Sequence, residues 1–159
     1  MRTPFFFGEF DLSVDPKNRI SVPSEIRRII VPETDGEAFF VTLRNRVAWM
    51  YPERYYEQLV SSQIVPDITP NEDLLAYAQL KFALASRIEW DAQGRIVLPE
   101  KLLKRAGLSR EVTLIGMQDH LELWNRGDWE DRREKLIEDS PNIETRAKAA
   151  LQQRPAERH

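Results

Sequence analysis

The sequence contains one short pattern twice, and this internal repeat is its strongest constraint on the fold. DPKNRISVP at residues 15–23 returns as DAQGRIVLP at residues 91–99, with Asp, Arg, Ile and Pro at equivalent positions. The similarity continues outside both segments, with an apolar residue three positions before and three positions after each. Because repeats of this kind report a supersecondary unit that is used more than once, the chain is predicted to consist of two similar halves.

Each half is predicted to be rich in β-structure. Residues 10–14 alternate apolar and polar side chains, as a half-buried strand does, and a return strand follows at 19–22 and again at 95–98. Asn18 and Gly94 occupy the same place in the two intervening turns, and both tolerate a positive φ. Each half is therefore predicted to open with a hairpin.

The remaining elements follow in the same order in both halves. Short basic helices are expected at 24–30 and 100–106, with Gly107 closing the second. Two further strands are expected in each half, at 38–43, 47–51, 111–115 and 120–124. Residues 39–43 parallel 112–116, and 50–52 parallel 123–125, after a length change of three residues.

Two helices are expected between the halves and one after them. The helix at 52–64 has an apolar face, and the next begins at 69–72 with a capping box that has proline at the first helical position. The second half ends in a helix at about 127–138, and 140–159 is predicted to be a tail with a weak amphipathic pattern. The phenylalanines at 5–7 and the four tryptophans are predicted to be packing residues.

Composition narrows the class of protein. The 159 residues include no cysteine and two histidines, and the net charge is −3. These counts argue against a disulfide framework, a zinc site with cysteine ligands and a thiol nucleophile. No apolar run approaches the roughly 18 residues that cross a bilayer. A cytoplasmic globular protein is expected, without metal, cofactor, membrane partner or small-molecule substrate.

The repeated residues resemble the MraZ family of bacterial transcriptional regulators. The resemblance rests on Gly8-Glu9-Phe10, on the two Asp-x-x-x-Arg segments that end in proline, and on Tyr51-Pro52. It covers about residues 5–138 and divides the chain into a first SpoVT/AbrB-type half-domain at 5–58, connecting helices at 59–85, a second half-domain at 86–138 and a flexible tail at 139–159.

This resemblance implies a fold and a function. The fold would be α+β and β-rich, a swapped-hairpin AbrB-like barrel made by the two half-domains with peripheral helices. Copies of the chain would form a ring-shaped homo-oligomer. The ring would bind double-stranded DNA at promoter direct repeats of a cell-division and cell-wall gene cluster, as a nucleoid-associated protein. The signature arginines, Arg19 and Arg95, would contact the DNA.

The residue chemistry of the turns agrees with DNA binding. Lys17, Asn18 and Arg19 bring a cation, an amide and a planar bidentate donor together, and Gln93 stands where the first turn has Lys17. Residues 15–30 have four basic against two acidic side chains, and residues 91–110 five against two. Secondary basic contacts with DNA are predicted for Arg27, Arg28 and Lys101. Asp15, Asp91 and Gly94 are predicted to structure the loops.

The same residues also allow different interpretations. The Asp and Arg of an Asp-x-x-x-Arg turn could instead form a salt bridge whose sole role is to stabilise a hairpin. Asp15 and Asp91 could form an aspartic-protease dyad, but neither has the Asp-Thr/Ser-Gly setting of such sites, so no enzyme is expected. Two non-enzymatic functions compete with DNA-dependent regulation: an antitoxin-like AbrB-type module whose main partner is a protein, and a structural ring without DNA affinity.

Overall fold

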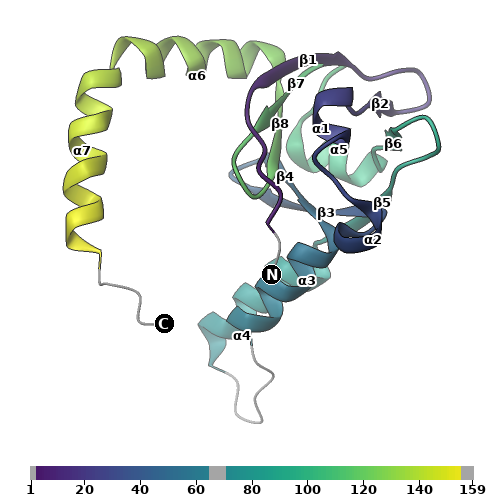
Figure 1. Ribbon diagram of the computed structural model, residues 1–159, viewed down its shortest axis with the longest axis horizontal. Coiled ribbons are helices and arrows are strands. Elements are labelled where there is room, and N and C mark those ends of the chain that lie inside the picture. Colours follow the sequence, from purple (N-terminus) through teal and green to yellow (C-terminus); the bar gives the residue numbers. More distant parts are fainter. Residues whose placement is uncertain (1–2, 65–70, 155–159) are drawn as a thin grey trace. The chain divides into compact units, whose positions relative to one another are not determined.

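The computed structural model describes residues 3–64 and 71–154 (Figure 1). The first half of the chain contains seven elements: β1 (Glu9–Ser13), β2 (Arg19–Ser21), α1 (Ser24–Arg27), α2 (Pro32–Asp35), β3 (Ala38–Arg44), β4 (Val47–Pro52) and α3 (Glu53–Gln63). The later elements are α4 (Glu72–Ala78), the π-helix η1 (Gln79–Ala83), β5 (Ser86–Glu89), β6 (Arg95–Val97), α5 (Glu100–Ala106), β7 (Glu111–Gly116), β8 (Leu121–Asn125), α6 (Arg126–Glu138) and α7 (Ser140–Gln153). The chain forms two compact units, and the boundary between them lies between Arg126 and Gly127.

The strands of the first unit exchange partners between the two halves of the chain. A six-stranded antiparallel sheet has the order β1-β7-β8-β4-β3-β5, and β2 pairs with β6 in a separate two-stranded ribbon. The first strand of each half therefore pairs with a strand of the other half. This exchange is the swapped-hairpin arrangement, and the α+β class with peripheral helices is confirmed.

The strand register repeats with the sequence. Leu12 lies opposite Val112 in the β1–β7 pair, and Ile88 lies opposite Phe39 in the β5–β3 pair. Leu12 and Ile88 are equivalent in the repeat, as are Phe39 and Val112. The two halves are thus related by a pseudo-twofold axis, which passes between Ile20 and its direct partner in the ribbon.

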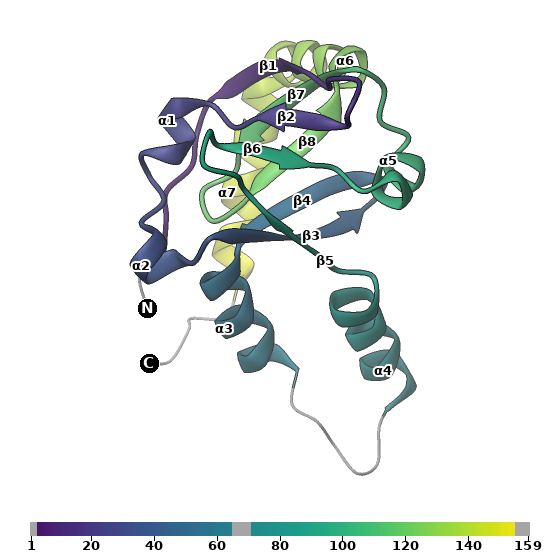
Figure 2. The ribbon, with the colours of Figure 1, turned by 90° about the vertical axis from the view of Figure 1, so that its right-hand side faces the viewer.

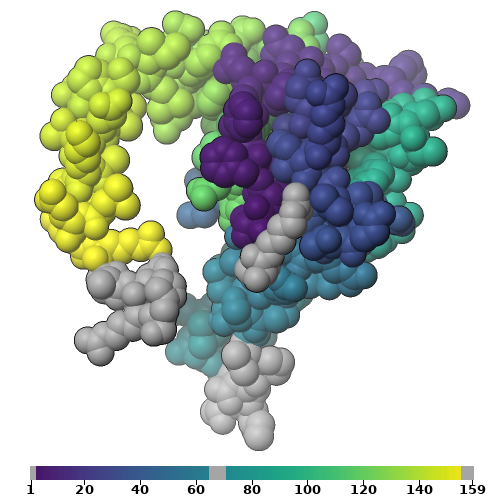
Figure 3. All heavy atoms as spheres, in the orientation of Figure 1, coloured from purple at the N-terminus to yellow at the C-terminus, as the bar shows by residue number. Residues whose placement is uncertain are grey.

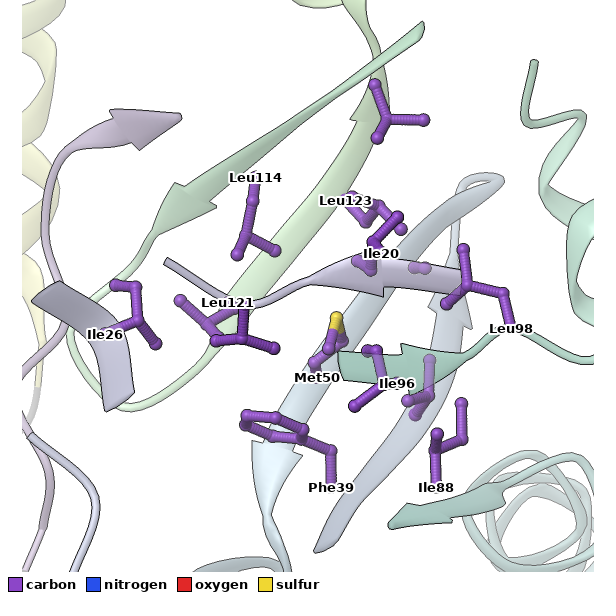
Figure 4. Close-up of a cluster of buried hydrophobic side chains, with 14 of the residues drawn as sticks. Ile20, Ile26, Phe39, Met50, Ile88, Ile96, Leu98, Leu114, Leu121 and Leu123 are labelled. Carbon is purple, nitrogen blue, oxygen red and sulfur yellow. The ribbon is translucent and has the colours of Figure 1, made fainter. Parts of the chain in front are cut away.

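The core lies between the ribbon and one face of the sheet. Ile20 of β2 and Ile96 of β6 point from the ribbon towards the sheet and are no more than 1% exposed (Figure 4). In Figure 2, α1 and α5 lie near the two ends of the ribbon. The sheet and its flanking helices contribute further buried side chains, among them Ile26, Phe39, Val41, Met50, Ile88, Leu98, Leu102, Val112, Leu114, Leu121 and Leu123.

Two details of the strand arrangement differ from expectation. The prediction that β1 pairs with β2, and β5 with β6, in two hairpin ladders is wrong. The two strands of each pair diverge after the turn, and each pairs with a strand of the other half. The barrel is also not closed by continuous strand pairing, since β1 and β5 are the two edges of the sheet. The ribbon completes the enclosure of the core mainly by packing, and a single bridge between Ile96 and Trp90 joins it to the end of β5.

The helices differ from the predicted ones mainly at their ends. The first basic helix is shorter than predicted, ending at Arg27, and the short helix α2 was not predicted. Gly107 ends α5 in the left-handed conformation, as predicted. The cap of α4 is Asn71, whose side chain accepts the Asp73 and Leu74 amides, and not the Thr69 of the predicted capping box; Thr69 and Pro70 lie outside the described residues.

The N-terminal phenylalanines do not share one environment. Phe6 is 1% exposed and pairs with Gln118 through two backbone hydrogen bonds, whereas Phe5 and Phe7 are 61% and 67% exposed. The prediction that all three belong to the core is therefore wrong for Phe5 and Phe7. Side chains alternate between opposite sides of an extended segment, so only every second one can face the core.

The second unit is a pair of consecutive helices. Asp139 separates α6 from α7, and its carboxylate accepts hydrogen bonds from Asn142 and Arg146 at 2.8 and 3.0 Å. Most of the segment predicted as a tail is thus helical, with no buried residue in α7.

Across residues 3–64 and 71–154, no helix combines the length and the apolar character needed to cross a membrane.

Candidate nucleic-acid interface

Loop 1, residues 15–19, is organised around the carboxylate of Asp15. Its Oδ1 accepts the backbone amides of Lys17 and Arg19 at 2.9 and 2.8 Å, and its Oδ2 accepts Nε of Arg19 at 2.7 Å. The backbone turn closes through the Asn18 amide and the Asp15 carbonyl at 2.9 Å, and Asn18 has a φ of 61°. One side chain therefore fixes both the turn and the direction of the arginine.

Loop 2, residues 91–95, has the same geometry. Asp91 Oδ1 accepts the amides of Gln93 and Arg95, and Oδ2 accepts Nε of Arg95, all at 2.9 Å. Gly94 has a φ of 75°, so the expected positive φ is confirmed at this position and at its counterpart in loop 1. The two loops therefore place their arginines in equivalent ways.

Each bracing aspartate favours the ionised form. The backbone amide of Arg19 makes the largest contribution to lowering the pKa of Asp15. Desolvation raises this pKa, but by less than the hydrogen bonds from Arg19 and Lys17 and the charge of Arg19 together lower it. The backbone amide of Arg95 likewise lowers the pKa of Asp91. A protease dyad needs one carboxyl group that keeps its proton. The hydrogen bonds found here support the carboxylate form in both loops, which disfavours a dyad.

The arginines are anchored at one edge and open at the other. Among the described residues, the contacts of Arg19 and Arg95 with acidic side chains use Nε alone, and the side chains are 26% and 33% exposed. The two terminal nitrogens of each guanidinium therefore remain available as a planar pair of donors. Such a pair matches the O6 and N7 acceptors of guanine.

Both arginines belong to the outer face of the ribbon. Ile20 and Ile96 point into the core, and successive side chains of a strand alternate between its faces. Arg19, Arg95 and the 55% exposed Val97 therefore share the opposite face. Arg19 lies opposite Val97, two residues from Arg95, so the arginines are separated by about 7 Å along the ribbon. Figure 1 shows both loops on one side of the first unit, and Figure 2 shows them at opposite ends of the ribbon.

The other predicted contact residues divide into exposed and engaged side chains. Lys17 and Gln93 are exposed at the loop tips. Asn18 is half-buried, and its Oδ1 accepts Nη1 of Arg110 at 3.2 Å. The same nitrogen donates to the Asp15 carbonyl at 2.7 Å. Arg110 therefore supports loop 1 from outside it. The sequence did not predict this role, because only the β1–β7 pairing brings Arg110 beside the loop.

The secondary basic residues are also placed differently from one another. Arg28 and Lys101 are exposed on α1's C-terminal side and in α5. Arg27 donates from Nε to the Val22 carbonyl at 3.1 Å, and its side chain covers the position where a Cβ would stand on Gly94. Arg27 thus supports loop 2 from the first half of the chain.

Replacement of Gly94 tests this support. We expect Gly94→Ala to lower the free energy of unfolding by about 1–2 kcal/mol from backbone strain at its positive φ. A further loss of about 0.5–1.5 kcal/mol is expected because Arg27 must move and release its hydrogen bond. Urea denaturation of Gly94→Ala measures the sum of the two losses in the free energy of unfolding.

Gly107→Ala is the matched control, since Gly107 has a φ of 61° and open space around the added Cβ. It should show the backbone cost alone. In an Arg27→Ala background, Gly94→Ala should cost no more than the control does. An unchanged difference between the two glycine variants in that background would contradict the role of Arg27.

The fold and the paired loops define a class: α+β proteins in which two half-domains exchange strands within one chain. Comparison with known proteins identifies the family. The family model described as "MraZ protein, putative antitoxin-like" matches residues 82–153.

Curated relatives match over most of the chain. A protein of Neisseria meningitidis serogroup C is 34% identical over 138 residues, which are 86% of this chain and 91% of the relative. One from Thermomicrobium roseum is 31% identical over 144 residues, 89% and 96% of the two chains, and one from Clostridium tetani is 32% identical over 134 residues, 84% and 90%. All three are named "Transcriptional regulator MraZ". The chain belongs to the MraZ family, and the names of its relatives support a role in transcriptional regulation.

Proposed function

We propose that the protein is a sequence-specific DNA-binding transcriptional regulator that reads DNA with the outer face of its β2–β6 ribbon. The observation that carries this proposal is the pair of aspartate-braced arginines on that face, each with its terminal nitrogens open. The bracing fixes the guanidinium before DNA arrives, so less side-chain entropy is lost on binding. The pseudo-twofold axis places the two equivalent arginines on the same exposed face, so one ribbon offers both to a single ligand.

The dimensions of the ribbon suit the proposed target. The major groove of B-DNA is about 12 Å wide and admits a two-stranded β-ribbon. Arg19 and Arg95 would contact base edges, while Lys17 and Gln93 at the loop tips would reach phosphates or neighbouring bases. Exposed Arg28 and Lys101 would add phosphate contacts. Both loops of one chain would then act on the same stretch of DNA.

We further propose that several copies act together as a ring on promoter direct repeats. One ribbon offers few contacts, so a single copy would bind weakly and be sensitive to salt. Copies held in one assembly bind neighbouring boxes at high effective concentration, with a gain in affinity of about 10² to 10⁴. The family resemblance suggests that the boxes precede a cell-division and cell-wall gene cluster, and that the protein acts at the nucleoid.

Binding should therefore depend on the number of boxes and on salt. We expect DNA from just upstream of the protein's own gene to be bound about 10² to 10⁴ times more tightly than a fragment with one repeat. With about 6–10 phosphate contacts, affinity should fall by about 10³ to 10⁵ between about 50 and 200 mM salt. Gel shifts and fluorescence anisotropy measure both effects. Full affinity for one repeat at high salt would contradict the proposal.

The family model's wording, antitoxin-like, favours one second candidate, a module whose main partner is a protein. The basic and acidic residues of the C-terminal segment are mixed, with Arg146 and Lys148 close to Glu144. A protein-binding antitoxin or a purely structural ring would retard upstream and unrelated DNA equally, whereas the proposed regulator distinguishes them.

A further inference from the structure

The first unit carries an exposed aromatic pair that is held on a fixed backbone. Phe5 and Phe7 lie on either side of buried Phe6, with their ring centroids 6.1 Å apart. Backbone hydrogen bonds of 2.7–2.8 Å tie Phe6 to Gln118, and the Gly8 carbonyl accepts the Gly116 amide at 2.8 Å. In Figure 3 the N-terminal segment, in purple, lies at the molecular surface. The two rings are therefore presented in a defined direction.

Gly116 shows how closely this segment is packed onto the sheet. A Cβ at Gly116 would overlap the backbone of Phe7 and Phe6. The segment thus cannot lift or turn easily without losing this contact. Because Phe6 is committed to the core, Phe5 and Phe7 must stay exposed in one copy of the chain. We refer to Phe5 and Phe7 together as the phenylalanine pair.

A pocket on another part of the same unit has the size and chemistry to receive an aromatic side chain. It has a volume of about 190 Å³ and lies between β3, α3 and the π-helix η1. Phe40, Tyr56 and Val60 give it an apolar lining, to which Lys81 and Phe82 of η1 also contribute. We call this the acceptor pocket.

The shape of the acceptor pocket is supported by ordered contacts. The Tyr56 hydroxyl donates to the Lys81 carbonyl at 2.6 Å, which joins α3 to the π-helix. The rings of Phe40 and Tyr56 stack at 5.1 Å. The pocket is therefore formed before any partner binds.

The segment that contributes Phe82 to the acceptor pocket exposes other apolar side chains as well. No residue of α4 is buried, and large apolar side chains from α4 to the residue after η1 are 41–62% exposed: Leu74, Leu75, Leu80, Phe82 and Leu84. Exposed apolar surface beside a pocket marks an interaction site. A seven-residue helix also gains little stability by itself, so contacts with a partner would stabilise it.

We propose that the phenylalanine pair of one copy inserts into the acceptor pocket of the next copy. The inference rests on the self-assembly part of the proposed function and assigns the surfaces that produce it. The two surfaces share no residue, and in Figure 2 the N-terminal segment and α4 lie on opposite sides of α3. Contacts between unlike surfaces of identical copies are heterologous, and they produce rings when the rotation closes.

Exposed residues on each surface allow a test with the full chain. Phe5→Asp/Phe7→Asp removes the inserted side, and Phe82→Asp, at a side chain that is 52% exposed, alters the pocket. Wild type should sediment as a closed oligomer, and each variant should self-associate at least about 30-fold more weakly. Phe5→Leu/Phe7→Leu should retain assembly. Leu151→Asp, on the 65% exposed Leu151 of α7, is the control and should leave assembly unchanged.

Mixing the two aspartate variants gives the decisive result. Each variant keeps one intact surface, so the mixture should form one-to-one dimers that cannot extend. A mixture that stays monomeric, or aspartate variants that assemble like wild type, would overturn this inference alone. A wild-type chain that sediments only as a monomer would overturn the proposed ring and this inference together. The monomeric variants should keep wild-type affinity for a single DNA box, since Arg19 and Arg95 are untouched.

Discussion

Replacing both ribbon arginines should abolish specific DNA binding while the protein stays folded. Each bidentate arginine–guanine contact contributes about 1–3 kcal/mol, so Arg19→Ala/Arg95→Ala should weaken binding of each copy by about 30-fold or more. In an assembly with several copies on one DNA, the losses multiply across the boxes. Anisotropy titration with upstream DNA measures the change.

The fold should tolerate this change. Both Asp–Arg pairs are partly exposed, and such surface pairs contribute little to the free energy of unfolding. Arg46→Ala/Arg54→Ala is the matched control, because both side chains are exposed and lie outside the ribbon, so this variant also loses two positive charges. Arg19→Lys/Arg95→Lys separates charge from geometry, since lysine cannot present two parallel donors. Equal affinities of the double alanine variant and the control would contradict a role of the ribbon in DNA binding.

Truncating the isoleucines at the pseudo-twofold axis should destabilise the whole first unit. Ile20 and Ile96 are no more than 1% exposed and face each other across the ribbon. Ile→Ala at such positions costs about 2–5 kcal/mol. Since the two residues are direct partners, the double variant should deviate from the sum of the single variants. Urea denaturation at fixed protein concentration measures these losses.

Val97→Ala is the control on the same ribbon, because Val97 is 55% exposed and its truncation should cost less than about 0.5 kcal/mol. Because β1 and β5 each pair with the other half, the halves should unfold in one transition. Two separated transitions, or an Ile96→Ala loss no larger than that of the control, would contradict this account of the core.

The repeat predicted much of this arrangement, and for a physical reason. Side-chain alternation, proline at the strand ends and a residue tolerant of positive φ in each turn are local properties, so strand positions, the left-handed turns and the end of α5 followed from sequence. The equivalence of Leu12 with Ile88 and of Phe39 with Val112 was also visible, and it reappears as identical strand register.

Strand partners and individual exposure could not be read in the same way. A local pattern predicts a hairpin wherever two strands flank a turn, and only the resemblance to a family indicated that the strands exchange. The burial of Phe6 between exposed Phe5 and Phe7 depends on the β7–β8 turn, more than 100 residues away in sequence. Arg110 and Arg27 reach the loops through packing between the halves, which leaves no mark on either segment.

Covalent joining of the two halves has an evolutionary consequence. In a dimer of identical subunits, every mutation appears on both sides of the axis at once. Here separate codons specify the two sides, so selection can alter one loop and leave its counterpart intact. Lys17 against Gln93 and Arg27 against its equivalent Leu103 are divergences of that kind. If the loops contact DNA as proposed, their difference lets the protein distinguish the two orientations of an asymmetric site.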